Sequence, residues 1–296
     1  MPMEDRQLID LLKSFVKQKS RPDQSTYASL TLAGASSIAE QSGRFLRDVE
    51  CVALAEEILP ERYSRNQKSL SCADQLKLLQ SHVAIIGLGG LGGTVVEILA
   101  RLGVGFLTLV DGDVFDESNI NRQLLSSPSR IGEKKAEAAS TRVQEINPAV
   151  NVRAVADFFN ATNGESLLTG VQLAVDCLDN IPARFTLERA CQKSSIPLVS
   201  AAIAGTSGQA TVVFPTDPGL RLIYGASDRA PHRGIEASLG TLPFAAAYMA
   251  AVQCAEVTTI LLGKPAELRQ QLFLADICDH TTEITELSAN LQNQRP

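Results

Sequence analysis

The residues best suited to chemistry begin with a run of glycines. Gly87, Gly89, Gly90 and Gly92 follow the apolar stretch 83–86, and the residues after them are typical of a helix. Glycine lets the backbone approach a phosphate closely, and the first turn of a helix offers unpaired N–H groups and a positive dipole end. The pattern therefore indicates a nucleotide site, without indicating which nucleotide it holds or whether that nucleotide is consumed.

Charged side chains after the glycines favour a triphosphate. Asp111 ends the next apolar stretch, where a carboxylate can bind both ribose hydroxyls of NAD or ATP, although an aspartate at a strand end is also common in turns. Asp113, Arg122 and Lys135 follow. Either cation alone would be an ordinary surface charge. Together, beside a glycine loop, they match the phosphate oxygens of a triphosphate, and a dinucleotide dehydrogenase has no need of an arginine here.

A further carboxylate, Asp179, follows the fourth apolar stretch. Ligands of doubly wound sheets bind at the carboxyl ends of the strands, so Asp179 is expected to face the same crevice as Gly87 and Asp111. Magnesium takes few protein ligands and binds phosphate as well, so Asp179 is a candidate magnesium ligand. The alternative is that Asp179 or Asn180 caps the next helix, and both roles can hold at once.

Strands alternating with helices must position these residues. Such alternation is typical of an α/β fold with a Rossmann-like, doubly wound, mainly parallel sheet covered by helices on both faces. We expect strands over 82–87, 105–111, 150–156, 172–177 and 196–203, and helices over 91–103, 132–146 and 181–194. The pattern changes near residue 205. A strand over 209–214, a long loop over 217–242, an apolar helix over 244–262 and two C-terminal strands over 271–277 and 283–288 complete the domain.

The first 59 residues are expected to form an N-terminal helical extension before a domain over 60–288 and a polar tail over 289–296. Helices are predicted over 4–17, 36–42 and 45–59, and a further helix over 67–80. Two short helices around Gly43 could form a helix-turn-helix. Acidic residues in the second one would repel DNA, so a packing extension is the favoured interpretation.

Composition limits the function further. The chain has 296 residues and a formal net charge of −6, without the overall basic footprint of a nucleic-acid-binding protein. No stretch approaches the roughly 18 to 20 uninterrupted apolar residues of a membrane span, and the acidic start has no signal-peptide core, so we expect a cytoplasmic protein. The six cysteines form no CxxC pair, and the three histidines are not at metal-ligand spacing, so zinc is not expected.

Taken together, these residues resemble the ThiF/MoeB/HesA family, the bacterial relatives of ubiquitin-activating enzymes. The resemblance covers roughly residues 60–277, and the order and spacing of its motifs are highly specific. The matching motifs are Arg62-Tyr63-Ser64-Arg65, Gly87 to Gly92, Leu109 to Asp113, Asn119 with Asn121-Arg122-Gln123, Gly132 to Lys135, Asp176 to Asn180, Pro197 to Ser200, and Gly208-Gln209.

The family implies an activity and a site. Its members bind ATP and magnesium, adenylate the C-terminal Gly-Gly carboxylate of a small ubiquitin-like protein, and release pyrophosphate. By resemblance, Asp111 binds the ribose, Arg122 and Lys135 bind the phosphates, and Asp179 is the magnesium-linked carboxylate. The candidate cofactor-binding residues are Gly87, Gly89, Gly90, Gly92, Asp111, Asp113, Asn119, Arg122, Gln123, Lys135, Asp179 and Asn180.

The resemblance also implies a homodimer. Arg65 resembles the arginine that reaches the γ-phosphate of the other subunit's ATP. Asn119 and Gln123 lie in the segment that faces the phosphates, and their roles are less defined. The candidate catalytic residues are Arg65, Arg122, Lys135 and Asp179.

Three departures from the family pattern shape the expected reaction. The segment Leu222–Gly225 replaces the first CxxC pair of many relatives, and only Cys278 follows Asp276, so a structural zinc is not expected. The loop 217–242 contains no cysteine, so the reaction is expected to stop at the acyl-adenylate. The extension over 1–59 is longer than in the simplest members and could clamp the substrate or widen the dimer.

The leading hypothesis is adenylation of a sulfur-carrier protein of the MoaD or ThiS type. A second hypothesis is activation of another carboxylate, on a peptide or a modified tRNA base. An NAD-dependent oxidoreductase would explain the glycines and Asp111 but not Arg122, Lys135 and Asp179. A non-catalytic scaffold would have no reason to carry every charged position of an ATP site.

Overall fold

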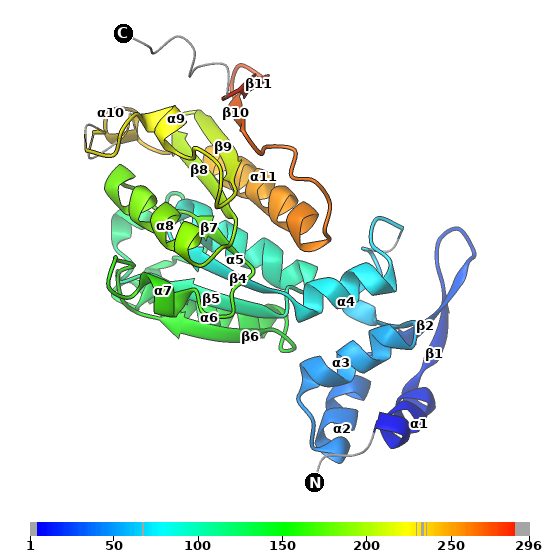
Figure 1. Ribbon diagram of the computed structural model, residues 1–296. Helices are drawn as coiled ribbons and strands as arrows, with labels where there is room; N and C mark the ends of the chain where they lie inside the picture. Colours follow the sequence, from blue (N-terminus) through cyan, green and yellow to red (C-terminus); the bar gives the residue numbers. More distant parts are fainter. Residues whose placement is uncertain (1–4, 67, 229, 232–233, 235, 288–296) are drawn as a thin grey trace.

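The chain folds around one eight-stranded sheet in a computed structural model that describes residues 5–66, 68–228, 230–231, 234 and 236–287 (Figure 1). The strand order is β11-β10-β9-β8-β7-β4-β5-β6. The neighbours from β8 to β6 pair in parallel, and those from β8 to β11 pair antiparallel. The strands are β4 His82–Ile86, β5 Phe106–Val110, β6 Asn151–Val155, β7 Leu173–Asp176, β8 Leu198–Ala204, β9 Ser207–Val213, β10 Gln271–Asp276 and β11 Thr281–Glu286.

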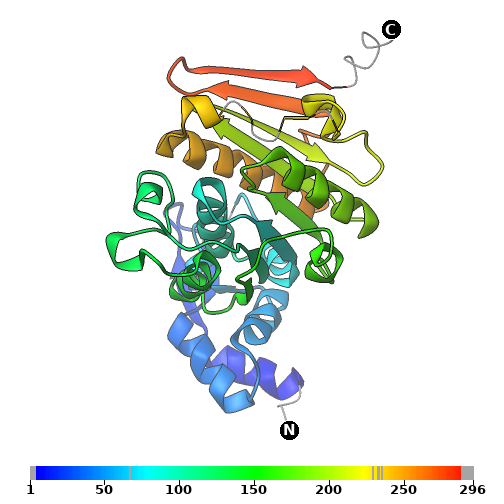
Figure 2. The same ribbon diagram turned by 90° about the vertical axis from the view of Figure 1, so that its left-hand side faces the viewer.

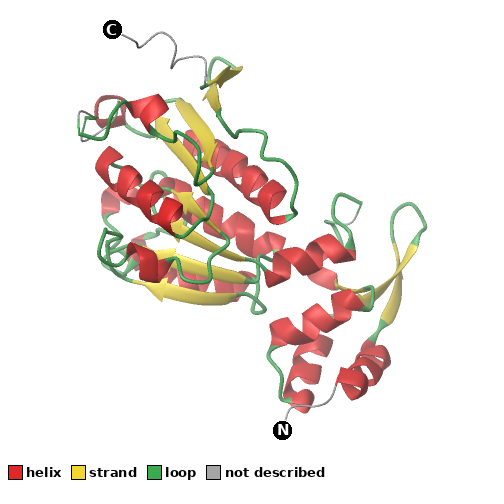
Figure 3. Ribbon diagram, viewed as in Figure 1, coloured by secondary structure: helices red, strands yellow, loops and turns green. Residues whose placement is uncertain are grey.

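Helices cover both faces of the parallel half, as the sequence predicts (Figure 3). The central strand β4 shows why: Val83 and Ile85 pack in one core cluster, whereas Ala84 and Ile86 pack in the other. Such strands read as continuous apolar runs because both of their faces are buried. One face is covered by α5 Gly90–Leu102, α6 Lys135–Ile146 and α11 Pro243–Leu261, and the other by α7 Gly164–Leu167 and α8 Ile181–Lys193.

Helix α11 is long and apolar enough to cross a membrane by length and composition alone, and core helices of soluble proteins meet the same criterion. Its inner face packs on α5, β8 and β9, and 44% of the apolar window is buried. Two polar side chains interrupt it and point into the protein: Gln253 donates to the carbonyls of Asp176 and Val199, and Glu256 accepts from the Leu268 N–H. Its outer face remains partly exposed.

The N-terminal extension is not purely helical, which corrects the prediction for this region. It contains a three-stranded sheet in the order β1-β2-β3, in addition to its helices, and has a hydrophobic core of its own. Figures 1 and 2 show it at one end of the α/β domain. Its elements are α1 Asp5–Phe15, β1 Lys17–Ser20, β2 Thr26–Leu30, α2 Leu32–Ser42, α3 Leu46–Ala55 and β3 Ile58–Pro60.

Short elements connect these layers. A 3₁₀ turn, η1 Glu61–Tyr63, leads from β3 toward α4 Cys72–Gln80. Helix α4 begins with a capping box formed by Ser71 and Asp74, and it packs against α3. The predicted loop over 217–242 includes two single-turn helices, α9 Arg221–Tyr224 and α10 Glu236–Leu239. Two further 3₁₀ turns, η2 Glu117–Asn119 and η3 Pro128–Arg130, lie before α6. The predicted tail over 289–296 lies outside the described residues.

Candidate functional site

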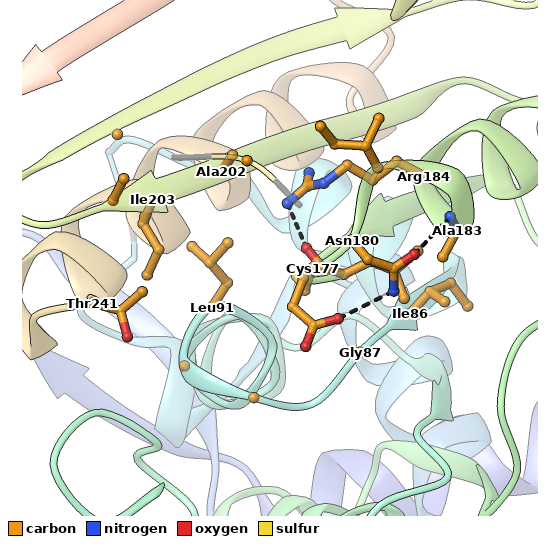
Figure 4. A pocket seen from close by; sticks show the side chains of 18 of the residues that line it. Ile86, Gly87, Leu91, Cys177, Asn180, Ala183, Arg184, Ala202, Ile203 and Thr241 are labelled. Atoms are coloured by element: carbon orange, nitrogen blue, oxygen red, sulfur yellow. Dashed lines mark hydrogen bonds between the residues drawn. The ribbon is translucent and has the colours of Figure 1, made fainter. Parts of the chain in front are cut away.

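A cleft of about 1000 Å³ opens at the carboxyl ends of the parallel strands (Figure 4). The loops after β4, β5 and β7 form one part of its wall, and the β8–β9 hairpin forms another. Most of the predicted site residues meet here although they are widely separated in the chain. The predicted residues that line the cleft are Gly87, Gly89, Gly90, Asp111, Asp113, Arg122, Gln123, Lys135, Asp179 and Asn180.

Close backbone contacts leave no room for a side chain at two positions of the glycine loop. Gly87 has φ of +90°, and a Cβ there would lie 2.6 Å from the carbonyl oxygen of Cys177. A Cβ on Gly92 would lie 1.9 Å from the carbonyl oxygen of Gly87. Gly89 precedes α5 without any side-chain cap, so the first N–H groups of the helix remain available to an anion.

Asp111 ties the glycine loop to the end of β5. Its carboxylate accepts hydrogen bonds from the backbone N–H of Leu88 at 2.7 Å and of Asp113 at 2.8 Å. A carboxylate oxygen has two lone pairs, so these bonds leave acceptor capacity for ribose hydroxyls. The residue therefore fixes the loop and still faces the cleft.

The two cations are held differently. Lys135 begins α6 with its side chain only 8% exposed, and its ammonium lies 3.1 Å from the carboxylate of Asp113. Arg122 is half-buried and donates to the Ser118 carbonyl at 3.0 Å and to the Asn121 side chain at 2.9 Å. Its charge is balanced by no carboxylate among the described residues, which suits it to an incoming anion.

The side-chain oxygen of Gln123 lacks a hydrogen-bond donor among the described residues. The side chain is buried, and its Oε1 atom accepts no hydrogen bond from any described residue. A buried amide oxygen without a donor is costly, and it lies in the wall of the cleft beside Gly89. A ligand that donates a hydrogen bond would relieve this cost.

Asn180, not Asp179, caps the helix that follows β7. Its side-chain oxygen accepts from the Ala183 N–H at 2.9 Å, and its amide donates to the Asp179 carboxylate at 3.2 Å (Figure 4). Asp179 is exposed at the cleft. The carboxylate is thus oriented by Asn180 and is left to bind a ligand or a cation, which separates the two roles that the sequence left open.

The structure leaves three predicted residues outside the cleft lining. Gly92 acts through the backbone packing described above. Asn119 is half-buried, and its side-chain oxygen accepts from the Asp116 N–H at 3.1 Å in the capping box of η2. Arg65 is exposed on the turn after η1 and has no hydrogen bond or ion pair to a described residue. The ligand roles assigned to them by resemblance stay predictions.

A buried polar network supports the site and was not predicted. Asp176, fully buried at the end of β7, pairs with Arg184 of α8 at 2.8 Å and accepts from Ser200 of β8 at 2.6 Å. Arg184 also donates to the carbonyls of Leu178 and Ala201. Burial, the largest single effect, lowers the pKa of Arg184, but the Asp176 carboxylate together with smaller contributions from neighbouring groups raises that pKa overall.

This network fixes the loop that carries Asp179, because the carbonyl of Leu178 is one of its acceptors. The available sequence signal was a lone aspartate, Asp176, ending a strand that is otherwise apolar. Its cationic partner could not be identified from spacing alone.

Within the described part of the chain, no group of three or more His, Cys, Asp or Glu side chains could hold a metal ion. A magnesium ion held jointly by Asp179 and nucleotide phosphates needs no such cluster. The exposed carboxylate at the cleft fits that arrangement.

The fold and the cleft define an α/β nucleotide-binding protein, and comparison with known proteins gives its family. The model of the ThiF family matches residues 63–295. The chain belongs to this family.

The chain is 34% identical to the SAMP-activating enzyme E1 of Haloferax volcanii over 78% of its own length and 86% of that protein. It is 32% identical to the adenylyltransferase and sulfurtransferase MOCS3 of Arabidopsis thaliana, over 72% of its own length and about half (47%) of that protein.

Solved structures show a similar fold at lower identity. Escherichia coli MccB with AMPCPP and MccA has a TM-score of 0.61 and 20% identity, over 86% of this chain and 82% of that one. PaaA has a TM-score of 0.62 and 23% identity, over 77% and 82% of the two chains. At these identities the likeness supports the fold alone.

Proposed function

We propose that this chain uses ATP and magnesium to adenylate the C-terminal Gly-Gly carboxylate of a ubiquitin-like sulfur-carrier protein, with release of pyrophosphate. The observation that carries the proposal is one cleft wall that combines a glycine loop, Asp111 and the cations Arg122 and Lys135. Membership of the ThiF family and relatives named as an activating enzyme and as adenylyltransferases support it.

The residues fit the chemistry of adenylation. A terminal carboxylate is ionised at pH 7 and needs no general base. One of its oxygens forms a bond to the α-phosphorus, and the bond from that phosphorus to the bridging oxygen of the leaving pyrophosphate breaks. Charge repulsion opposes this attack, and Lys135, Arg122 and the N–H groups at the start of α5 would offset it.

Magnesium would be held by Asp179 together with the phosphates, and it would supply further neutralisation of their charge. The Asn180 amide orients the Asp179 carboxylate, and Arg184 holds the carbonyl of the residue before it. The proposed metal position therefore rests on side chains that the fold already fixes.

The other part of the cleft suits a chain end with small residues. Ala202, Ala204 and Gly208 of the β8–β9 hairpin line it, together with Tyr224, whose hydroxyl accepts from Gln209 at 2.9 Å. Small side chains leave room for an extended backbone beside the hairpin. This arrangement supports a Gly-Gly terminus as the substrate.

We further propose that the active form is a homodimer in which Arg65 reaches the partner's ATP. Arg65 does not line the cleft of its own chain. A groove of about 370 Å³ lies between α5 and α11, is bordered by Leu70, and includes the exposed residues Ala251 and Ala255. Leu70, at the border of this groove, is five residues after Arg65 in the chain. An exposed apolar face so near Arg65 in the sequence supports a second copy of the chain as its occupant.

Isotope exchange between pyrophosphate and ATP tests the function. We expect exchange only when a carrier ending in Gly-Gly is added, and none with the same carrier lacking its last two glycines. Exchange with a short peptide or with tRNA instead would favour the second hypothesis. Binding of NAD without binding of ATP would contradict the proposal.

A further inference from the structure

The turn that carries Arg65 is anchored to the N-terminal extension by a buried ion pair. The Arg62 guanidinium donates to both carboxylate oxygens of Glu50, at 2.6 and 2.7 Å. Glu50, in α3, is fully buried, and the Arg62 side chain is 19% exposed. Removing one partner of such a pair leaves the other charge buried without compensation, so the contact strongly restrains the turn.

The same turn is anchored to the α/β domain by Tyr63. The ring is fully buried, and its hydroxyl accepts from the Asn147 amide at 2.8 Å. Asn147 also donates to the Ala100 carbonyl at 3.0 Å. A Cβ on Gly103 would lie 2.6 Å from the Tyr63 ring, so the ring fills space that only glycine leaves open there.

A third anchor follows Arg65. The Asn66 amide donates to the Gln75 side chain at 3.1 Å, and the buried Gln75 donates to the Leu102 carbonyl at 2.7 Å. Residues on both sides of Arg65 are therefore fixed, whereas Arg65 itself is exposed and bonds to no described residue. Because the backbone on both sides of Arg65 is fixed, its long cationic side chain can be positioned toward another molecule.

We propose that Glu50 is a positioning residue for Arg65, so that the N-terminal extension of one subunit prepares the phosphate site of the other. The inference rests on the proposed function and its homodimer. Among these three anchors, Glu50 belongs to the extension, whereas Asn147 and Gln75 belong to the rest of the chain. The extension also binds Glu61, at the start of the same turn, through the hydroxyls of Tyr27 and Ser29. The extension thereby gains a role in catalysis that is independent of any contact with the carrier.

Mixed dimers test this role, because they separate effects within a subunit from effects across the interface. Glu50→Gln homodimers are expected to lose exchange activity on the order of 100-fold, the size of a misplaced catalytic group, with KM for the carrier little changed. In a dimer with an Asp179→Ala subunit, the Glu50→Gln subunit keeps its own cleft and receives a well-placed Arg65 from its partner. Activity should return to about half of the wild-type value, because one of the two sites is intact.

Matched variants serve as controls. Lys135→Ala mixed with Asp179→Ala should give no rescue, since both changes disable the cleft of their own subunit. Asp48→Asn alters a neighbouring, half-exposed carboxylate of α3 that pairs with Arg47, and should behave as wild type. If Glu50→Gln fails to fold, the double variant Glu50→Gln/Arg62→Gln removes both buried charges and enters the same mixing experiment.

The outcomes distinguish the two proposals. Wild-type exchange in Glu50→Gln homodimers, or no rescue by Asp179→Ala while Arg65→Ala is rescued, would overturn the role of Glu50 and leave the proposed function standing. Failure of Arg65→Ala to be rescued in verified mixed dimers would overturn the arrangement across the interface, and the role of Glu50 with it. Absence of carrier-dependent exchange in the wild type would overturn the proposed function itself.

Discussion

At the scale of single residues, the two cations of the cleft differ in whether they are already paired with a carboxylate. Lys135 is buried against Asp113, so its position is fixed before any nucleotide arrives. Arg122 bonds only to neutral oxygens and is half-buried. We infer that Lys135 is the preorganised charge and Arg122 the one that adjusts on binding.

Replacing Lys135 should therefore impair the chemical step. We expect Lys135→Ala to lower kcat for exchange by about 100-fold to 1000-fold, because a preorganised donor at the developing charge is lost. Lys134→Ala, which removes an exposed cation one position earlier, is the control and should change kcat little. Equal losses in the two variants, measured by pyrophosphate exchange, would contradict the assignment.

The exposure of Phe158 at the cleft indicates a role in binding the base of ATP. Its side chain is 61% exposed and lines the cleft, and its ring lies against Gly112, next to Asp111. An aromatic face beside the carboxylate that we propose binds the ribose is suited to stack on a base. Because such stacking is worth about 1–3 kcal/mol per base, Phe158→Ala should raise KM for ATP roughly 5-fold to 150-fold.

The control for this prediction is Phe45→Ala. Phe45 is 75% exposed and lies in the N-terminal extension at the start of α3. Its replacement should leave KM for ATP unchanged. A Phe158→Ala enzyme with unaltered KM for ATP would show that the ring does not touch the base.

At the scale of elements, the strand–loop–helix unit needs glycine at two positions for two different reasons, one for folding and one for binding phosphate. A side chain at Gly92 collides with the Gly87 carbonyl, whereas a side chain at Gly89 meets nothing closer than 3.6 Å. We expect Gly92→Ala to lower the free energy of unfolding by about 3 kcal/mol, through overpacking of the loop. Gly89→Ala should fold normally and still bind ATP poorly, because its Cβ enters the space for phosphate.

Thermal unfolding and ATP titration of both variants test this separation. A normally stable Gly92→Ala protein would show that the loop can relax. ATP binding of wild-type strength in Gly89→Ala would show that the phosphates do not approach the loop at that residue.

Whether an element could be predicted from the sequence depends on how it is buried. Strands β4, β5 and β7 could be predicted because burial of both faces leaves uninterrupted apolar runs, such as Val83–Ile86. Strand β1 could not, since its sequence Lys-Gln-Lys-Ser is mostly exposed and carries no apolar alternation. Strand β3 is three residues long and only two residues separate it from the end of α3, so its sequence pattern merges with that of the helix.

The candidate site divides in the same way. Gly87, Asp111, Lys135 and Asp179 could be placed in one cleft because they follow strands or open helices of a single repeating pattern. The pair of Asp176 and Arg184 could not be predicted, because it depends on how a helix lies over two strands. Long-range pairing of buried polar groups has no local sequence signal of its own.

At the scale of the whole molecule, the proposed reaction requires two copies of the chain. The groove between α5 and α11 is the surface that we expect the second copy to cover. Placing a long cation there, as in Ala255→Arg, should bury an unpaired charge in the interface and shift the protein toward monomer. Activity should fall with the dimer, because each site then loses the partner's Arg65.

Light scattering on the purified protein measures this shift. Ala33→Arg, an exposed helical position in the N-terminal extension, is the matched control and should leave the molecular mass unchanged. An Ala255→Arg protein that remains dimeric would place the interface elsewhere.

The central claim is that the α-phosphate of ATP is transferred to a carrier's terminal carboxylate. Its most direct test is to incubate the chain and a Gly-Gly carrier with ATP labelled at the α-phosphate and, in parallel, with ATP labelled at the γ-phosphate. We expect the α label to remain with the carrier under acid quench and the γ label to leave as pyrophosphate. Label from the γ-phosphate on the carrier, or no label on it from either nucleotide, would contradict the account.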